Sequence, residues 1–250
     1  MLIDITYGLK NEMNKYPSDP EPSILVTKAT KKDEIETILD ESGLSSGAGF
    51  EKSKYSSGYT TLNTRSHHGT HIDAPAHKLP GGKTIDQYPL TKFSNTVGIV
   101  DMTYQNIYRR IKSEIKPEDL HAGRLINIAK NTGAILFYTG FMDYLINKKN
   151  NNEGSFPFFS QEAIKEIVNL FPKLNIIGID SFSLDPRGSN SEVHRAMFEK
   201  DILPLETICN MDRLRQAQKE KPLSIKTLSC FPILINGSDA AQTRAIVELK

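Results

Sequence analysis

The chain has 250 residues, of which 38% are hydrophobic and 24% are charged, and its formal net charge is +1. This composition is that of an ordinary folded protein and excludes a disordered chain. A net charge this close to zero gives no electrostatic reason to expect binding to nucleic acid or to an anionic membrane surface.

The N-terminal segment MLIDITYGLKNEMNKYP lacks the basic stretch and long apolar core of a signal peptide. No apolar run elsewhere approaches the roughly 18 residues that a membrane-spanning helix needs. We therefore expect a cytoplasmic protein with no membrane segment and no nucleic-acid partner. Cys209 and Cys230 form no CxxC pair, and we expect both to be buried thiols rather than a disulfide framework.

Five short runs rich in Ile and Val, each bounded by Gly, Asn, Asp or Pro, predict strands. Their near-continuous apolar character favours sheets that are covered on both faces. Ser160 is a candidate N-cap for a helix with apolar residues at helical spacing. No boundary divides the chain, so we expect one α/β domain over residues 1–250. In chain order the predicted elements are strand 24–29, strand 96–102, a helix start at 116–120, strand 134–140, an exposed loop at 148–155, helix 160–171, strand 175–180, a surface helix or mobile loop at 211–221 and strand 231–237.

The segment SHHGTHIDAPAH, residues 66–77, holds four of the six histidines of the chain. His67, His71, Asp73 and His77 are separated by even numbers of residues, so on an extended chain their side chains emerge on one face. His68 is at an odd position and should point the other way. Imidazole and carboxylate together favour Zn²⁺, Mn²⁺ or Fe²⁺ over Mg²⁺ or Ca²⁺.

A fully extended segment would place His67 and His71 about 13 Å apart, too far for two ligands of one ion at about 2.0–2.2 Å each. The chain must therefore curl between them, and Gly69 supplies the freedom to do so. Pro75 then restricts Ala74 to extended conformations. The alternative is a polar turn with unrelated surface histidines; the placement of the glycine and the proline favours the metal site.

Several segments, in order along the chain, resemble the cyclase-like amidohydrolase family, which includes bacterial kynurenine formamidases and isatin hydrolases. HHGTHIDAPAH resembles its signature motif, and INGSDAAQTRAI (235–246) resembles its closing G-D-G-x-P-x-R segment. The other resembling segments are YPSDPEPSI (16–24), ILFYTGF (135–141), GIDSFSLDP (178–186) and SEVHRAMFEKDILPLETICNMDRL (191–214). The family resemblance implies a swivelling β/β/α fold, with mixed sheets and flanking helices, assembled as a homodimer or homotetramer.

The resemblance also implies roles for particular residues. It implies that His77 donates and accepts the proton in catalysis, and that Asp73 can bridge two ions. Independently, Glu206 lies in the apolar stretch LPLETI, where an ionised carboxylate is costly unless it is paired or metal-bound. The implied metal ligands are His67, His71, Asp73, His194 and Glu206, for one or two divalent ions, with Zn²⁺ expected and Mn²⁺ the alternative.

Departures from the family pattern leave the substrate open. The chain has no Trp, and Tyr16 stands where the family's formamidases often carry a Trp near the substrate. We expect Tyr16 to contact the substrate, because a tyrosine can stack on an aromatic ring and donate a hydrogen bond. The expected function is hydrolysis of a small amide, kynurenine formamidase-like, by a metal-activated water. The alternatives are isatin hydrolase-like opening of a cyclic amide and a metal-binding protein without catalysis.

Overall fold

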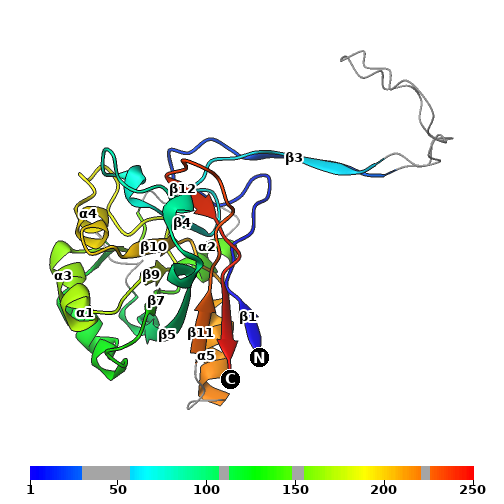
Figure 1. Ribbon diagram of the computed structural model, residues 1–250. Helices are drawn as coiled ribbons and strands as arrows, with labels where there is room; N and C mark the ends of the chain where they lie inside the picture. The colour runs from blue at the N-terminus through cyan, green and yellow to red at the C-terminus, as the bar shows by residue number, and fades with distance from the viewer. Residues whose placement is uncertain (30–56, 107–112, 148–154, 221–225) are drawn as a thin grey trace, which may run out of the picture.

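The computed structural model describes residues 1–29, 57–106, 113–147, 155–220 and 226–250. Within them, a nine-stranded mixed sheet with the order β1-β13-β11-β5-β7-β9-β10-β4-β12 forms the body, and helices flank it (Figure 1). The predicted α/β class is confirmed. The strands are β1 (Leu2–Asp4), β2 (Ser23–Thr27), β3 (Tyr59–Asn63), β4 (His71–Asp73), β5 (Ser94–Asp101), β6 (Glu114–Ile115), β7 (Ala134–Tyr138), β8 (Phe158–Phe159), β9 (Ile176–Ile179), β10 (Leu203–Glu206), β11 (Lys226–Ser229), β12 (Ala240–Gln242) and β13 (Ile246–Leu249). The helices are α1 (Pro117–Ala122), α2 (Phe141–Asn147), α3 (Gln161–Leu170), α4 (Glu192–Phe198) and α5 (Met211–Glu220).

The middle of the sheet is parallel and is buried on both faces. Strands β5, β7, β9 and β10 pair in parallel, and β7 is buried along its whole length. Ile135 and Phe137 belong to the core that includes residues of α1, α3 and α4, whereas Leu136 and Tyr138 belong to the core that includes residues of α5. Such two-sided burial explains why these strands read as continuous apolar runs.

Most predicted elements are present. The runs 96–102, 134–140 and 175–180 are strands β5, β7 and β9, and Ser160 caps α3 because its Oγ accepts from the amide of Ala163 at 3.1 Å. The segment 211–221 contains helix α5, and 116–120 lies at the start of α1. The predicted loop at 148–155 falls almost entirely outside the described residues. Cys209 and Cys230 are free and buried, as expected. None of the helices that the structure describes is both long and apolar enough to cross a bilayer.

The prediction of a strand at 231–237 is wrong. Ile233 and Leu234 are 54% and 77% exposed, and the segment makes only an isolated bridge between Pro232 and Thr243. Pro232 has no N–H to donate to a ladder, and the chain turns before it enters β12. We refer to residues 231–235 as the apolar edge segment.

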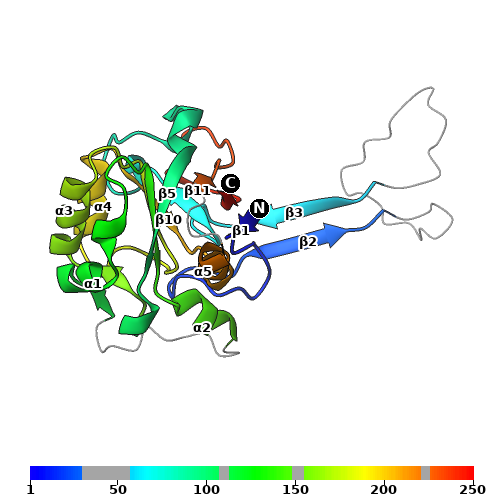
Figure 2. The same cartoon turned by 90° about the horizontal axis from the view of Figure 1, so that it is seen from below.

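Strands β2 and β3 form a separate antiparallel pair that projects from the body (Figures 1 and 2). We call this pair, residues 23–27 and 59–63, the arm. The predicted strand at 24–29 is therefore present, but the expectation that both its faces are covered is wrong. Every residue of β3 is exposed, and Leu25 and Val26 of β2 are 62% and 61% exposed.

Candidate metal centre

Strand β4 lies between β10 and β12, and this position gathers the acidic and imidazole side chains. His71 and Asp73 are two residues apart, so they share one face of β4. Glu206 of β10 is the antiparallel partner of His71. Directly opposed residues in an antiparallel pair have Cβ atoms about 4.5–5.5 Å apart. The register therefore brings Glu206 beside His71.

The chain reaches β4 through the curl that the sequence predicts. Gly69 has a φ of +69°, and a Cβ at this position would lie 2.6 Å from the carbonyl oxygen of Tyr7. Any other residue would be strained at this positive φ, and its Cβ would clash with the backbone of Tyr7. Beyond the strand, Ala74 is extended at φ −110° and ψ 161°, as expected before a proline. His68 points elsewhere, with Nδ1 3.0 Å from the hydroxyl of Thr64.

The two oxygens of Asp73 face different histidines. Oδ1 lies 3.0 Å from Nδ1 of His67 and 3.3 Å from Nε2 of His71. Oδ2 lies 3.2 Å from Nε2 of His194. Glu206 closes the group, with Oε2 3.4 Å from His71 and Oε1 3.3 Å from His194. All five residues that the sequence predicts as ligands therefore meet around Asp73.

Each of these histidines is held by its outer nitrogen and presents its inner nitrogen to the carboxylates. Nε2 of His67 lies 2.9 Å from Asp239, and Nδ1 of His71 lies 2.8 Å from the carbonyl oxygen of Gly69. Nδ1 of His194 lies 2.5 Å from Asp185. Because these acceptors can only accept, the outer nitrogens carry the protons and the inner nitrogens are available as ligands.

This arrangement fits a divalent metal ion. Donor atoms about 2.0–2.2 Å from one ion at tetrahedral angles lie about 3.4 Å apart, which matches the spacing around Asp73. Within the described residues, the buried Nε2 of His71 and Oδ1 of Asp73 have no hydrogen-bond partner. The donor atoms form two sets, and within each set all atoms lie within 4.8 Å of one another. One set is His67, Asp73 and His77, and the other is His71, Asp73 and Glu206, so Asp73 belongs to both. These residues could therefore hold one or two ions, and Asp73 would be a ligand in either case.

The pKa values also indicate that positive charge is stabilised among these donor atoms. Burial alone would lower the pKa of His67 and His71, but the Asp73 carboxylate overrides it and raises them to about 9 and about 10. Burial would raise the pKa of Asp73, but His67 and His71 hold it well below its usual range. Burial and Asp73 would also raise the pKa of Glu206, yet the neighbouring imidazoles of His194 and His71 lower it to about 2. In the metal-free chain, protons occupy the place that a cation would take.

Asp185 positions His194. It follows β9 and binds the first turn of α4 through the amides of Val193 and His194, each at 3.0 Å. The same carboxylate also holds the imidazole of His194. One side chain therefore fixes both the helix and the ring that the helix carries.

His77 stands beside the donor group but is held differently. Its Nδ1 lies 3.0 Å from Oδ2 of Asp239, and its Nε2 lies 3.8 Å from Oδ2 of Asp73. Hydrogen bonds from His67 and His77 hold the pKa of Asp239 far below its usual range, so Asp239 is ionised and can only accept. Nδ1 of His77 therefore donates to Asp239, and within the described residues no hydrogen bond engages its Nε2.

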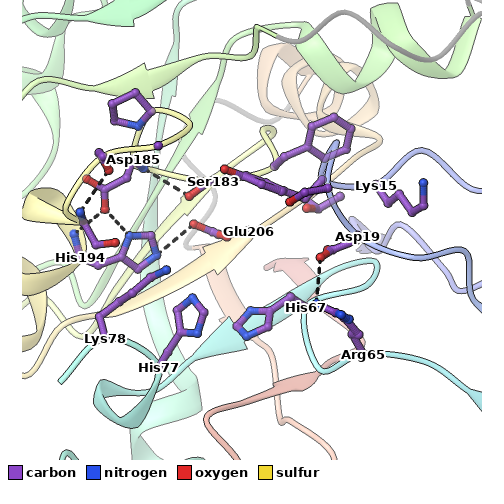
Figure 3. A pocket seen from close by; sticks show the side chains of 18 of the residues that line it. Lys15, Asp19, Arg65, His67, His77, Lys78, Ser183, Asp185, His194 and Glu206 are labelled. Atoms are coloured by element: carbon purple, nitrogen blue, oxygen red, sulfur yellow. Dashed lines mark hydrogen bonds and ion pairs between the residues drawn. The ribbon is translucent and has the colours of Figure 1, made fainter. Parts of the chain in front are cut away.

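The donor group opens into a cavity of about 260 Å³ (Figure 3). His67, His77, His194 and Glu206 point into it in that view, with Lys15, Arg65 and Lys78 around them. Tyr16, the predicted substrate contact, is half-buried and lines this cavity. The centroid of its ring lies 5.6 Å from that of Phe156. Burial raises the pKa of Tyr16, so its hydroxyl stays protonated and can donate.

Asp185 and Asp239 are the functional residues that the sequence did not reveal as such. Both lie in segments that resemble the family, but an isolated Asp in a loop carries no sign of its partner. Asp239 is 162 residues from His77, and only the pairing of β12 with β4 brings them together. His121, by contrast, is a surface residue whose Nε2 pairs with Glu166 at 2.7 Å.

Comparisons with known proteins show what the chain as a whole is similar to. The family model described as "Putative cyclase" matches residues 3–186. Cyclase-like protein 1 of Arabidopsis thaliana is 26% identical over 72% of this chain, which spans 66% of the plant protein's length. The kynurenine formamidase of Salinibacter ruber is 24% identical over 98% of this chain and 96% of its own. The solved structure of isatin hydrolase A from Ralstonia solanacearum has a TM-score of 0.69 at 18% identity, covering 99% of this chain and 91% of that one. The structural likeness concerns the fold.

Proposed function

The chain belongs to the cyclase family, and from that premise we propose that it is a metal-dependent hydrolase of small amides that acts as an arylformamidase. One observation carries the proposal. The His77–Asp239 pair, with its free Nε2, stands beside a donor group in which three histidines present their inner nitrogens to two carboxylates. A purely structural metal site has no use for such an additional base.

His67, His71, Asp73, His194 and Glu206 would hold the ion, with Zn²⁺ proposed and Mn²⁺ the alternative, since both accept imidazole and carboxylate ligands. When bound, a divalent ion supplies Lewis acidity to the carbonyl oxygen and lowers the pKa of a coordinated water. The histidines are already oriented for this by their outer hydrogen bonds. The fixed rings cost little reorganisation when the ion binds.

His77 moves the proton in this proposal. Its Nε2 accepts a proton from water as the water oxygen bonds to the carbonyl carbon. The C–N bond then breaks, and Nε2 returns the proton to the leaving nitrogen, so the products are a carboxylic acid and an amine. Asp239 holds Nδ1–H and stabilises the doubly protonated ring.

The cavity suits a small aromatic amide. Tyr16, Phe182 and Pro186 line it, and its volume of about 260 Å³ limits the substrate to a small molecule. Relatives named as kynurenine formamidases support an N-formylated aryl amine such as N-formylkynurenine. The same aromatic lining would receive a fused cyclic amide such as isatin, which is the second candidate.

Turnover of purified protein loaded separately with Zn²⁺ and Mn²⁺ tests the proposal, using N-formylkynurenine, simple formanilides, isatin and lactams. We expect hydrolysis of the formyl compounds. Ring opening of isatin alone would replace the arylformamidase assignment with the second candidate. Bound metal with no hydrolysis of any compound would favour the non-catalytic alternative.

The variant His77→Ala should retain its metal and lose roughly 10²–10⁴-fold in turnover. Asp239→Asn, which keeps the side chain's shape, should lose roughly 10–100-fold. His121→Ala changes an exposed histidine and serves as the matched control. Full turnover in metal-loaded His77→Ala would refute its role as the base. Loss of metal from this variant would make His77 a ligand instead.

A further inference from the structure

The side chain of Asn14 is a buried polar group for which the described part of the chain supplies no hydrogen-bond partner. The residue is only 7% exposed, and its Oδ1 is buried without a partner among the described residues. None of those residues accepts a hydrogen bond from its Nδ2 either, because the bond that Asn14 donates comes from its backbone amide. Folded proteins pair most buried polar groups, so this exception needs an explanation.

A second asparagine shows how the same fold treats a buried carboxamide elsewhere. Asn95 is also 7% exposed, but its Nδ2 donates to the carbonyl of Lys92 at 2.8 Å, and its Oδ1 accepts from Nδ2 of Asn175 at 2.7 Å. Asn14 differs from Asn95 in its place, because it lines the cavity of about 260 Å³ at the metal centre. Its missing partner is therefore expected in that cavity.

The backbone of Asn14 is tied to the metal centre by a short series of hydrogen bonds. Its amide donates to the hydroxyl of Tyr7 at 3.0 Å. The amide of Tyr7 donates to Oγ1 of Thr70 at 2.7 Å, and its carbonyl accepts from the amide of Thr70 at 3.0 Å. Thr70 immediately precedes His71, a predicted ligand. Asn14 is therefore held in a fixed place relative to the donor group, as a residue that orients a bound molecule must be.

We propose that Asn14 is a specificity-determining residue, and that its Nδ2 donates a hydrogen bond to a carbonyl oxygen on the aryl amine part of the substrate. This inference rests on the proposed function, because it names a group on the substrate of the same site. Tyr16 lines the same cavity two residues along the chain and offers its ring to the aryl group that carries this oxygen. A buried polar group that the substrate must pair discriminates against analogues that lack the matching atom.

The charges beside Asn14 indicate that this oxygen is uncharged. Nζ of Lys15, the next residue, lies 2.7 Å from Oε1 of Glu21, and a guanidinium nitrogen of Arg65 lies 3.5 Å from Oδ1 of Asp19. Lys15, Arg65 and Asp19 lie on the same side of the cavity (Figure 3). Since both cations already have carboxylate partners, a substrate carboxylate on this side would lose its water without gaining an ion pair. A ketone oxygen carries no such cost.

Titration calorimetry with the metal-loaded full chain tests the proposal without requiring hydrolysis. The probes are two aryl amines of similar shape, aminoacetophenone, which has a ketone oxygen, and isopropenylaniline, which has a methylene in its place. Each is tested as its ortho, meta and para isomers. For at least one isomer the ketone should bind wild type roughly tenfold more tightly, as expected for one hydrogen bond between neutral groups. Asn14→Leu should bind both compounds equally.

Two binding results would overturn the proposal. One is equal affinity of wild type for the two compounds at every ring position. The other is a preference of wild type for aminobenzoate over aminoacetophenone that Asn14→Leu abolishes, because the bound group would then be a carboxylate.

The formyl derivatives of the same amines separate this inference from the proposed function. Wild type should hydrolyse the formylated ketone with a lower KM than its isopropenyl counterpart, and Asn14→Leu should remove that difference. A ketone preference in binding with no hydrolysis of any formyl compound would refute the proposed function and leave the role of Asn14 intact. Hydrolysis of both compounds with no ketone preference in binding or in KM would do the reverse.

Stability measurements distinguish substrate recognition from a structural role. Asn14→Leu keeps a similar shape and removes an unpartnered polar group, so without substrate it should be no less stable to urea than wild type. Asn95→Leu, at the same exposure, removes two hydrogen bonds and should lower the urea midpoint. An equal fall in both variants would show that Asn14 serves the fold, and would overturn the proposal.

Discussion

The metal centre and the arm reverse the usual placement of side chains in opposite ways. The centre buries groups that normally stay in water: Asp73, His71, His194 and Glu206 are all at most 3% exposed. The arm exposes groups that are normally buried, with Val26 and Leu62 on one uncharged face. Each buried charge has partners within the chain that fix its position, whereas the described residues supply no strand partner for the arm. The comparison shows that one chain supplies the partners of its buried charges, whereas its described residues do not cover the apolar side chains of the arm.

Asp73→Asn removes the charge on which the centre depends, and we expect the largest effect from it. Both donor sets contain Asp73, so the variant should lose its metal. Turnover should fall by more than the 10–100-fold that is typical of a residue behind the ligands. Metal analysis and turnover of the same preparation check this. Asp212→Asn, an exposed position on α5, is the control. Normal metal content in Asp73→Asn would show that the carboxylate does not organise the site.

A pH titration of metal binding tests whether protons and metal compete for the centre. In the metal-free chain the pKa values of His67 and His71 are raised to about 9 and about 10, so both are protonated near pH 7. Binding at pH 7 should therefore release protons, and the affinity should rise about tenfold per pH unit for each proton displaced.

The same shifts predict the stability of the metal-free protein. A raised histidine pKa contributes stability that is fully present below about 6.5 and is lost as the pH rises through 9 to 10. The metal-free chain should therefore weaken over that range, and the loaded protein should not. Titration calorimetry of metal binding in buffers of different ionisation enthalpy counts the protons that binding releases. No proton release at pH 7 would contradict these assignments.

Gly69→Ala tests the curl that brings His67 to the centre. Gly69 and Gly81 both have positive φ, at +69° and +72°, but only at Gly69 would a Cβ meet the backbone of Tyr7. We expect Gly81→Ala to cost about 1–2 kcal/mol of folding free energy. Gly69→Ala should cost roughly 1–3 kcal/mol more, because the close contact adds to the strain. Urea denaturation of both variants measures the difference, and equal costs would show that the clash is relieved.

Leu25→Ser should have the smallest effect and sharpens the view of the arm. Leu25 pairs with Thr61, on the opposite face from Val26 and Leu62, and it is 62% exposed. The free energy of unfolding should change by no more than about 0.5 kcal/mol. Urea denaturation of the variant and of wild type measures the difference. A loss of several kcal/mol would show that Leu25 packs against another part of the folded protein.

The sequence predicts the parts of this molecule whose pattern has one physical cause. Strands β5, β7 and β9 are apolar because both their faces are covered, so their runs are plain in the sequence. Strand β4 is as buried as they are, but it reads as polar because two of its three residues belong to the metal centre. Its place in the sheet follows from pairing with β10 and β12, which no local pattern encodes.

Apolar character alone does not reveal where an element ends up. The run 231–237 reads like a buried strand but is an exposed segment, and the strand at 24–29 belongs to the arm rather than to the body. In both cases the apolar side chains signal burial, and the described part of the chain does not provide it. Asp239 and Asp185 could not be identified from local pattern at all. Their partners are distant in the sequence or belong to another element.

The pairing of distant segments at β4 has a consequence for how the protein matures. Asp73 and His194 are 121 residues apart, and His67 and Asp239 are 172 apart. During synthesis the segment through β12 must leave the ribosome before β12 can pair with β4 and Asp239 can orient the His67 ring. Contacts over such separations form late, after most of the loop-closure entropy has been lost. A site that needs all of these side chains is therefore complete only after β4, α4, β10 and β12 have come together.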